Sequence, residues 1–155
     1  MRHQFVNYGE GVNNLDLNYM HPNLLMLFAY INAFCLENGI SFNVTSIYRS
    51  EEKDKQLKAV SKTHQQGRAF DFSIRSEHGW TYEKIQNLVD TLNELVNTED
   101  LESGFANPFY GIGALSARDL SQRVIVVHNN HDGPGSHAHV QCKPTHEWEI
   151  KTHRR

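Results

Sequence analysis

The sequence is poor in cysteine and has no long apolar run, and each shortage excludes a class of protein. Its two cysteines, Cys35 and Cys142, cannot form the disulfide framework of a small secreted domain, so we expect free thiols. The longest apolar cluster, 24–35, is interrupted by Asn32 and is far too short to cross a bilayer. The first nine residues contain no apolar signal-peptide core. The sequence therefore predicts synthesis in the cytoplasm without a signal peptide, and no membrane insertion.

The chain also has little excess of charge of either sign, with a net charge of -3 at pH 7. Lysine and arginine are scattered along the chain, so the sequence offers no basic patch for nucleic acid. A length of 155 residues is enough for one domain with a real core and too short for two. We therefore expect a single domain over 1–155, a monomer that does not bind nucleic acid.

Histidine is the residue type whose number is unusual, with ten in the chain. Imidazole and carboxylate are ligands that a borderline divalent ion such as Zn²⁺ accepts. His64 and Asp71 lie seven residues apart with Gly67 between them, and His137 and His139 are alternate residues further along the chain. This pattern invites a metal-site hypothesis.

Hydrophobic periodicity predicts a mixture of helices and strands. The predicted helices are 22–38, 51–58 and 82–97, the last of them capped by Thr81. The predicted strands are 42–49, 68–74, 124–128 and 136–143. Turn-forming residues predict an N-terminal arm over 1–20, and the polar end predicts a C-terminal tail over 144–155. The chain should therefore fold as α+β, with a mostly antiparallel sheet, helices packed on one face and a metal cleft on the other.

The two-residue period of a strand decides which side chains can meet. In the strand 68–74, Asp71 takes the face opposite to the phenylalanines, and in the strand 136–143, His137 and His139 share a face. Alternate residues stand roughly 7 Å apart along a strand, so these two histidines cannot easily grip the same ion. We expect one of them to bind the ion and the other to act beside it.

A catalytic zinc site keeps three protein ligands and leaves one position for water. His64, Asp71 and His139 supply such a trio. His137 is then placed to take the proton of the water, and Arg49 to hold the developing oxyanion or to grip a substrate carboxylate. Each residue alone has a commoner role in a surface hydrogen bond or as a solvated charge, so it is the ordered set that favours a metal site.

The same residues resemble a known family. The pattern His64-x-x-Gly67-x-Ala69-x-Asp71, preceded by Tyr48-Arg49-Ser50 and followed by His137-x-His139, is similar to the D-Ala-D-Ala-type zinc metallopeptidases. That family includes D-alanyl-D-alanine carboxypeptidases, L-alanyl-D-glutamate endopeptidases and phage endolysins. The wider group contains lysostaphin-type peptidases and the hedgehog domain. The resemblance extends over 42–143, and the matching residues are concentrated in three short segments, 48–50, 64–71 and 137–139.

The resemblance implies a zinc peptidase that hydrolyses peptide bonds in the stem peptides of bacterial peptidoglycan. It gives the zinc ligands as His64, Asp71 and His139, the base as His137, and a substrate contact at Arg49. It also implies an endolysin-like protein that reaches the cell wall through a separate, holin-type pore. The alternative is a zinc-containing binding or structural domain of the same fold, because the hedgehog domain carries such a site without hydrolysing cell walls. A metal-free wall-binding module is a third reading.

Two departures from the family pattern leave alternatives open. Family members usually carry serine two residues before the first ligand, where this chain has Lys62, with Ser61 one residue further out. In some branches the third ligand is a lone histidine on a strand that follows a Gly-Ile-Gly-like segment. This chain has such a segment ahead of His128, so His128 rivals His139 as the third ligand. His131 is a further candidate for a second imidazole in the site.

Overall fold

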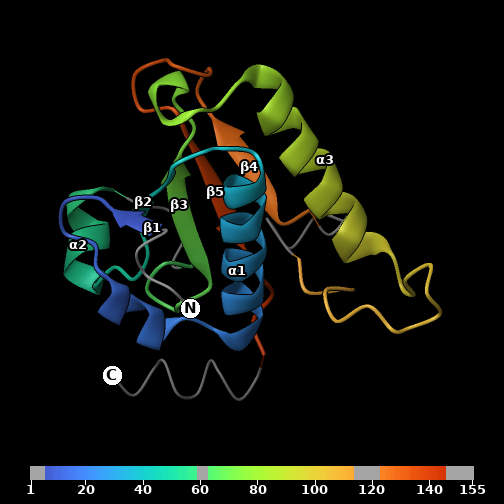
Figure 1. Ribbon diagram of the computed structural model, residues 1–155. Helices are drawn as coiled ribbons and strands as arrows, with labels where there is room; N and C mark the ends of the chain where they lie inside the picture. The colour runs from blue at the N-terminus through green and yellow to red at the C-terminus, as the bar shows by residue number, and fades with distance from the viewer. Residues whose placement is uncertain (1–5, 59–62, 114–122, 146–155) are drawn as a thin grey trace.

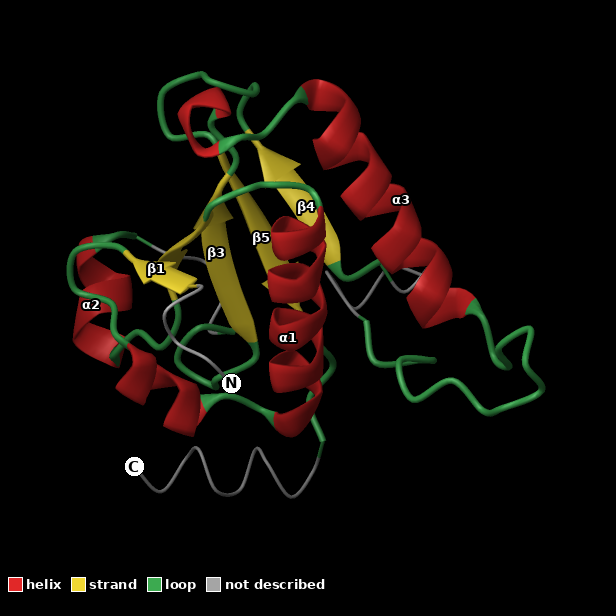
Figure 2. Ribbon diagram, viewed as in Figure 1, coloured by secondary structure: helices red, strands yellow, loops and turns green. Residues whose placement is uncertain are grey.

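The computed structural model describes residues 6–58, 63–113 and 123–145 (Figure 1). Its helices are α1 (Pro22–Glu37), α2 (Glu51–Gln56) and α3 (Tyr82–Asn97), with short 3₁₀ helices at Asn14–Tyr19 and Ser76–His78. Its strands are β1 (Val6–Tyr8), β2 (Phe42–Ser46), β3 (Ala69–Ser73), β4 (Ile125–His128) and β5 (His137–Gln141). The architecture is α+β, as the sequence predicts (Figure 2).

A five-stranded sheet forms the centre of the molecule, in the order β1-β2-β3-β5-β4. The pairings β2–β3, β3–β5 and β5–β4 are antiparallel. In contrast, β1 runs parallel to β2. The sheet is therefore mixed, and the prediction of a mostly antiparallel sheet is wrong in this respect.

The parallel strand comes from the segment 1–20, for which the sequence predicts an arm without regular structure. Val6 is buried and pairs with Phe42, so the described part of this segment extends the sheet. A 3₁₀ helix follows, capped by Asn13, whose side chain accepts the backbone N–H of Leu15 at 2.8 Å. A three-residue strand is too short to display a two-residue period, which is why the pattern gives no signal for it.

The apolar face of the sheet carries the core and is covered by α1. The ring of Phe28 in α1 lies 5.2 Å from those of Phe42 in β2 and Phe70 in β3, measured between centroids. In Figure 1, α1 lies in front of the sheet, α3 runs beside β4, and α2 lies beyond β1 and β2. The helix α3 begins at its predicted cap, where Thr81 Oγ1 accepts the backbone N–H of Lys84 at 3.2 Å.

Both cysteines lie inside this core. Cys35 and Cys142 are buried and are free thiols, as the sequence predicts. Burial raises the pKa of each thiol to about 12, because the thiolate loses its hydration there. Within the described ranges there is no helix with the length and apolar character that a membrane crossing requires.

Candidate metal centre

Asp71 lies in the middle of β3, on the face of the sheet turned away from α1. Its neighbours Phe70 and Phe72 are fully buried, and Phe70 packs against α1. Because side chains alternate along a strand, Asp71 projects to the opposite face. Burial opposes the ionisation of Asp71, but the hydrogen bond to the imidazole of His139 counteracts it, and the pKa of this carboxyl is held below its usual range. The side chain is therefore a carboxylate, the form that binds cations.

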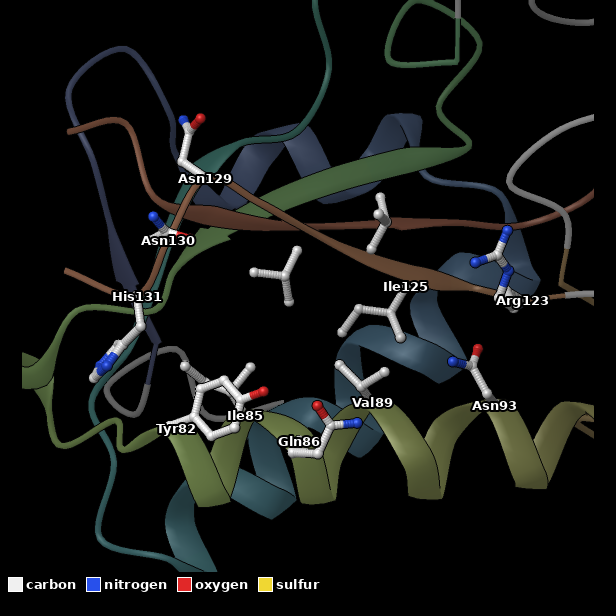
Figure 3. A pocket seen from close by; sticks show the side chains of 12 residues that line it. Tyr82, Ile85, Gln86, Val89, Asn93, Arg123, Ile125, Asn129, Asn130 and His131 are labelled. Atoms are coloured by element: carbon white, nitrogen blue, oxygen red, sulfur yellow. The ribbon is translucent and has the colours of Figure 1, made fainter. Parts of the chain in front are cut away.

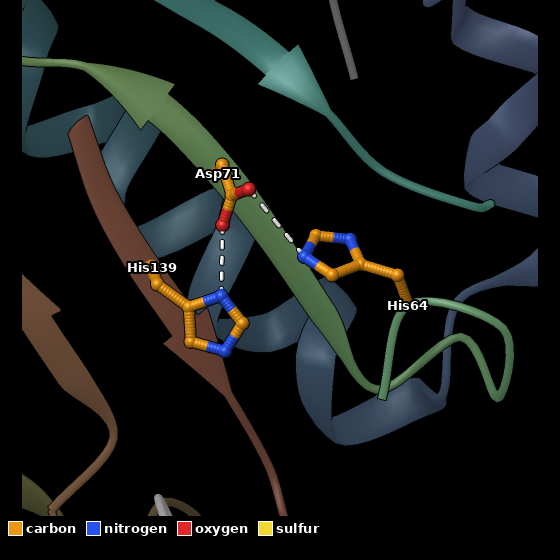
Figure 4. A group of neighbouring side chains, drawn as sticks. All are labelled: His64, Asp71 and His139. Carbon is orange, nitrogen blue, oxygen red and sulfur yellow. Dashed lines mark hydrogen bonds and ion pairs between the residues drawn. The ribbon is translucent and has the colours of Figure 1, made fainter. Parts of the chain in front are cut away.

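His139 faces Asp71 from the neighbouring strand β5. The two residues are directly paired across the β3–β5 ladder, and His139 Nδ1 lies 2.8 Å from Asp71 Oδ1 (Figure 4). The other ring nitrogen, Nε2, lies 3.0 Å from Gln141 Oε1. Because an amide oxygen only accepts, His139 Nε2–H donates to Gln141, and Nδ1 is the atom turned towards Asp71.

The electrostatics of His139 follow from this contact. Burial lowers the pKa of His139, but the hydrogen bond and the charge of Asp71 raise it more strongly, so the net pKa lies above the ordinary value. The guanidinium of Arg49 acts in the opposite direction and lowers it. The Nδ1 atom that contacts Asp71 is therefore the ring nitrogen that a metal ion would bind.

His64 approaches Asp71 from the loop before β3. Its Nδ1 lies 2.7 Å from the backbone carbonyl oxygen of Ile47, which only accepts, so Nδ1–H is the donor. The lone pair of Nε2 then points towards Asp71 Oδ2 at 3.4 Å. This Nε2 is buried and makes no hydrogen bond. Two acceptors that face each other without a proton are a favourable place for a cation.

The shape of this loop depends on Gly67. Its φ is +68°, a left-handed conformation that favours glycine. The turn brings the backbone N–H of Gly67 to the carbonyl of His64 at 3.2 Å, and the N–H of Arg49 approaches the same carbonyl at 3.4 Å. These contacts tie the His64 loop to the end of β2. The unusual positions Ser61 and Lys62 lie outside the described residues.

The three side chains lie close enough to one another to share one ion. Their ligand atoms all lie within 4.8 Å of one another, and the group could hold a metal ion. Bonds of about 2.1 Å that meet at the tetrahedral angle place two ligand atoms about 3.4 Å apart, which is the His64–Asp71 separation. Exposed fractions of 2%, 13% and 16% for the side chains of His64, Asp71 and His139 leave the group mostly enclosed, with a small part accessible to solvent.

The rival ligand His128 is not part of this group. It lies in β4, and its ring centroid is 6.2 Å from that of His139. Its direct partner across the ladder is His137, with ring centroids 4.9 Å apart. His137 lies on the same face of the sheet as Asp71, the face turned away from α1, which we call the open face. Its Nδ1–H donates to the carbonyl of Gly135 at 2.8 Å, which leaves Nε2 as its basic nitrogen.

His131 lies in a different part of the molecule. Together with side chains of α3 and β4 it lines a cavity of about 370 Å³ (Figure 3). Its Nε2 lies 3.6 Å from a carboxylate oxygen of Asp132, the next residue in the chain. His131 is therefore not an additional imidazole of the His64–Asp71–His139 group.

Arg49 lies beyond the end of β2, whereas the sequence predicts it within a strand over 42–49. The register of β2 against β3 shifts between Val44 and Ser46, and regular pairing stops there. Ser50 then caps α2 by accepting the backbone N–H of Lys53 at 3.2 Å. Arg49 consequently sits in a loop, where it lines a cavity of about 560 Å³.

Two groups that support the candidate ligands by hydrogen bonds were not identified from the sequence. The Ile47 carbonyl that orients His64 is a backbone group, and every residue has one, so the residue type cannot indicate this role. Gln141 could have been identified from the sequence, because it follows His139 by two residues and therefore lies on the same face of the strand. Outer hydrogen bonds of this kind fix the tautomer and orientation of metal-binding histidines.

Comparison with known proteins yields no match for this chain among family models, curated proteins or solved structures.

Proposed function

We propose that this protein is a zinc-dependent peptidase that hydrolyses peptide bonds in the stem peptides of bacterial peptidoglycan. The observation that carries the proposal is the buried lone pair of His64 Nε2, held by the Ile47 carbonyl and aimed at the Asp71 carboxylate. His139 completes the group from the adjacent strand. The cell-wall substrate is drawn from the resemblance of the three matching segments to the D-Ala-D-Ala-type metallopeptidases.

The donor set favours zinc over the hard cations. Two imidazoles and one carboxylate suit a borderline ion, whereas Ca²⁺ and Mg²⁺ prefer six or more oxygen ligands. The described residues contain no fourth histidine, cysteine or carboxylate that joins the group. Three protein ligands, rather than four, are typical of a catalytic rather than a structural zinc site.

A zinc ion held by His64, Asp71 and His139 would polarise a substrate carbonyl and lower the pKa of a water molecule. On the protein side, His137 Nε2 takes the proton of this water and returns it to the leaving amine. Its Nδ1–H is anchored on Gly135, so the basic nitrogen is fixed. Arg49 holds the negative charge that develops on the carbonyl oxygen, or binds a carboxylate of the substrate.

The cavity beside Arg49 suits a short peptide that carries charges of both signs. Its volume is about 560 Å³, and its lining includes the acidic Glu10 and Asp16 and the basic Arg49 and Lys53. We propose further that the protein is made in the cytoplasm and reaches this substrate through a separate pore, in the manner of an endolysin.

Mass spectrometry of purified peptidoglycan, incubated with the protein in the presence and absence of a zinc chelator, tests the proposal. We expect new stem-peptide fragments that disappear with chelator and return when zinc is restored. The masses identify the bond that is cut. The Asp71→Asn variant is the matched control, because it keeps the shape of the side chain and removes its charge. An undigested wall in every sample, with zinc still bound, would favour the non-catalytic zinc domain instead.

A further inference from the structure

A second pair of imidazoles lies on the open face of the sheet, beside the His64–Asp71–His139 group. His128 in β4 and His137 in β5 are direct partners across the ladder. Their ring centroids are 4.9 Å apart and their planes differ by 31°. The rings of His64 and His139 in the first group are 5.3 Å apart, so the second pair is spaced closely enough for both rings to reach one ion.

The nitrogens of this pair are available for binding. His137 donates Nδ1–H to the carbonyl of Gly135, so its Nε2 carries the lone pair, as in His64 with the Ile47 carbonyl. His128 is exposed to solvent, and no hydrogen bond to its ring occurs in the described part of the chain. Positions on two paired strands of a sheet fix both side chains at their Cα atoms, which limits the entropy lost on binding.

The chemistry of the pair sets its ligand class and its strength. Two neutral imidazoles without a carboxylate select borderline transition metals such as Zn²⁺, Ni²⁺ and Cu²⁺, and offer nothing to Ca²⁺ or Mg²⁺. With two protein ligands instead of three, and no formal negative charge, the pair must bind zinc more weakly than the first group. Water molecules would fill the other positions around the ion.

We propose that His128 and His137 form a second, weaker site for a transition-metal ion, and that occupation of this site inhibits the protein. The inhibition rests on the proposed function, because the ion takes the Nε2 lone pair with which His137 would accept a proton. The metal binding itself does not rest on it. Excess zinc would therefore inhibit the enzyme by binding His137, which is not a ligand of the first zinc ion.

Equilibrium dialysis against Zn²⁺ alone, with the metal content measured by elemental analysis, tests the binding. We expect one tightly held ion and a second ion that binds at least about tenfold more weakly, because it lacks the carboxylate and the third ligand. His128→Ala and His128→Gln should each remove the weaker ion and keep the tight one. His131→Ala, a histidine on the cavity beside α3, is the matched control and should keep both.

Two outcomes of the dialysis would overturn the site. One is a weaker ion that persists unchanged in both His128 variants, which would place it on other histidines of the chain. The other is loss of the tight ion from the same variants, which would make His128 a ligand of the first group. A folded-state check by circular dichroism accompanies each variant, and the exposure of His128 favours correct folding.

Peptidoglycan hydrolysis measured at rising zinc concentration tests the inhibition. At zinc tenfold above the weaker dissociation constant the second site is about 90% occupied, so the wild-type rate should fall about tenfold. The His128→Ala rate should stay within about twofold of its value without excess zinc. Equal inhibition of both proteins would overturn the regulatory part. If the wild type hydrolyses nothing, the proposed function fails, and the dialysis alone still decides the metal site.

Discussion

The two imidazole groups on the open face of the sheet differ in what surrounds them. The first group contains a carboxylate, and its rings are oriented by the Ile47 carbonyl and by Gln141. The second, His128 with His137, has no carboxylate and one oriented ring. A similar ring spacing therefore does not make the two sites equivalent. Charge and outer hydrogen bonds, rather than the number of histidines, set which of them holds an ion firmly.

The largest effect should come from removing a ligand of the first group. In His64→Ala and Asp71→Ala, zinc affinity should fall by more than about 100-fold, because loss of even an outer hydrogen bond costs 10–100-fold. Both variants should lose their bound ion and all hydrolysis. Elemental analysis of the purified proteins and the peptidoglycan digest provide the two readouts. Stoichiometric zinc in either variant would remove that residue from the ligand set.

A variant of His137 tests most directly whether the two groups have different roles. His137→Ala should keep the tight zinc ion, yet its turnover should fall by about 10²–10⁴, the usual contribution of a positioned acid-base group. His139→Ala should lose both zinc and turnover. Zinc content and kcat are measured on the same preparations. The reverse result would exchange the roles of the two histidines.

Arg49 interacts electrostatically with the first group. Its charge acts on His139 and is not among the charges that shift His128. Arg49→Ala should lower kcat/KM by about 10²–10³, as expected for a lost oxyanion partner. A fall in kcat would assign it to the developing charge, and a rise in KM alone to a substrate carboxylate. Arg49→Lys, which keeps the charge without the bidentate fork, is the control.

The smallest effect should follow from Gln141. Gln141→Leu removes the acceptor for His139 Nε2–H, and zinc affinity should fall by about 10–100-fold while the ion still binds at saturation. Competition with a chromogenic chelator measures this affinity. Gln141→Glu keeps an acceptor at the same place and should lie close to the wild type. Equal losses in both variants would mean that Gln141 supports the strand rather than the histidine.

The sequence predicts the open face of the sheet better than it predicts the sheet itself. The two-residue period correctly turns Asp71 away from the phenylalanines and places His137 and His139 on one face. Turn and cap residues gave the starts of α1 and α3. These successes share a cause, since local periodicity and capping depend on near neighbours in the chain.

What the sequence misses depends on contacts between distant segments. The pairing of Asp71 with His139 spans 68 residues, and no local pattern specifies it. The parallel strand β1 is three residues long and is held by β2 rather than by its own periodicity. Arg49 leaves its predicted strand because the register shifts after Val44, and the Ile47 carbonyl becomes a partner of His64 for the same reason.

The position of β5 in the sheet has a consequence for how the molecule is made. This strand lies between β3 and β4, yet it is translated after both of them. Until residues 137–141 leave the ribosome, β3 has an unpaired inner edge, β4 has no partner, and His64 and Asp71 have no His139. Completion of the sheet and assembly of the candidate metal group are therefore one event in biosynthesis. A chain that stops short of this strand can neither finish folding nor carry the full site.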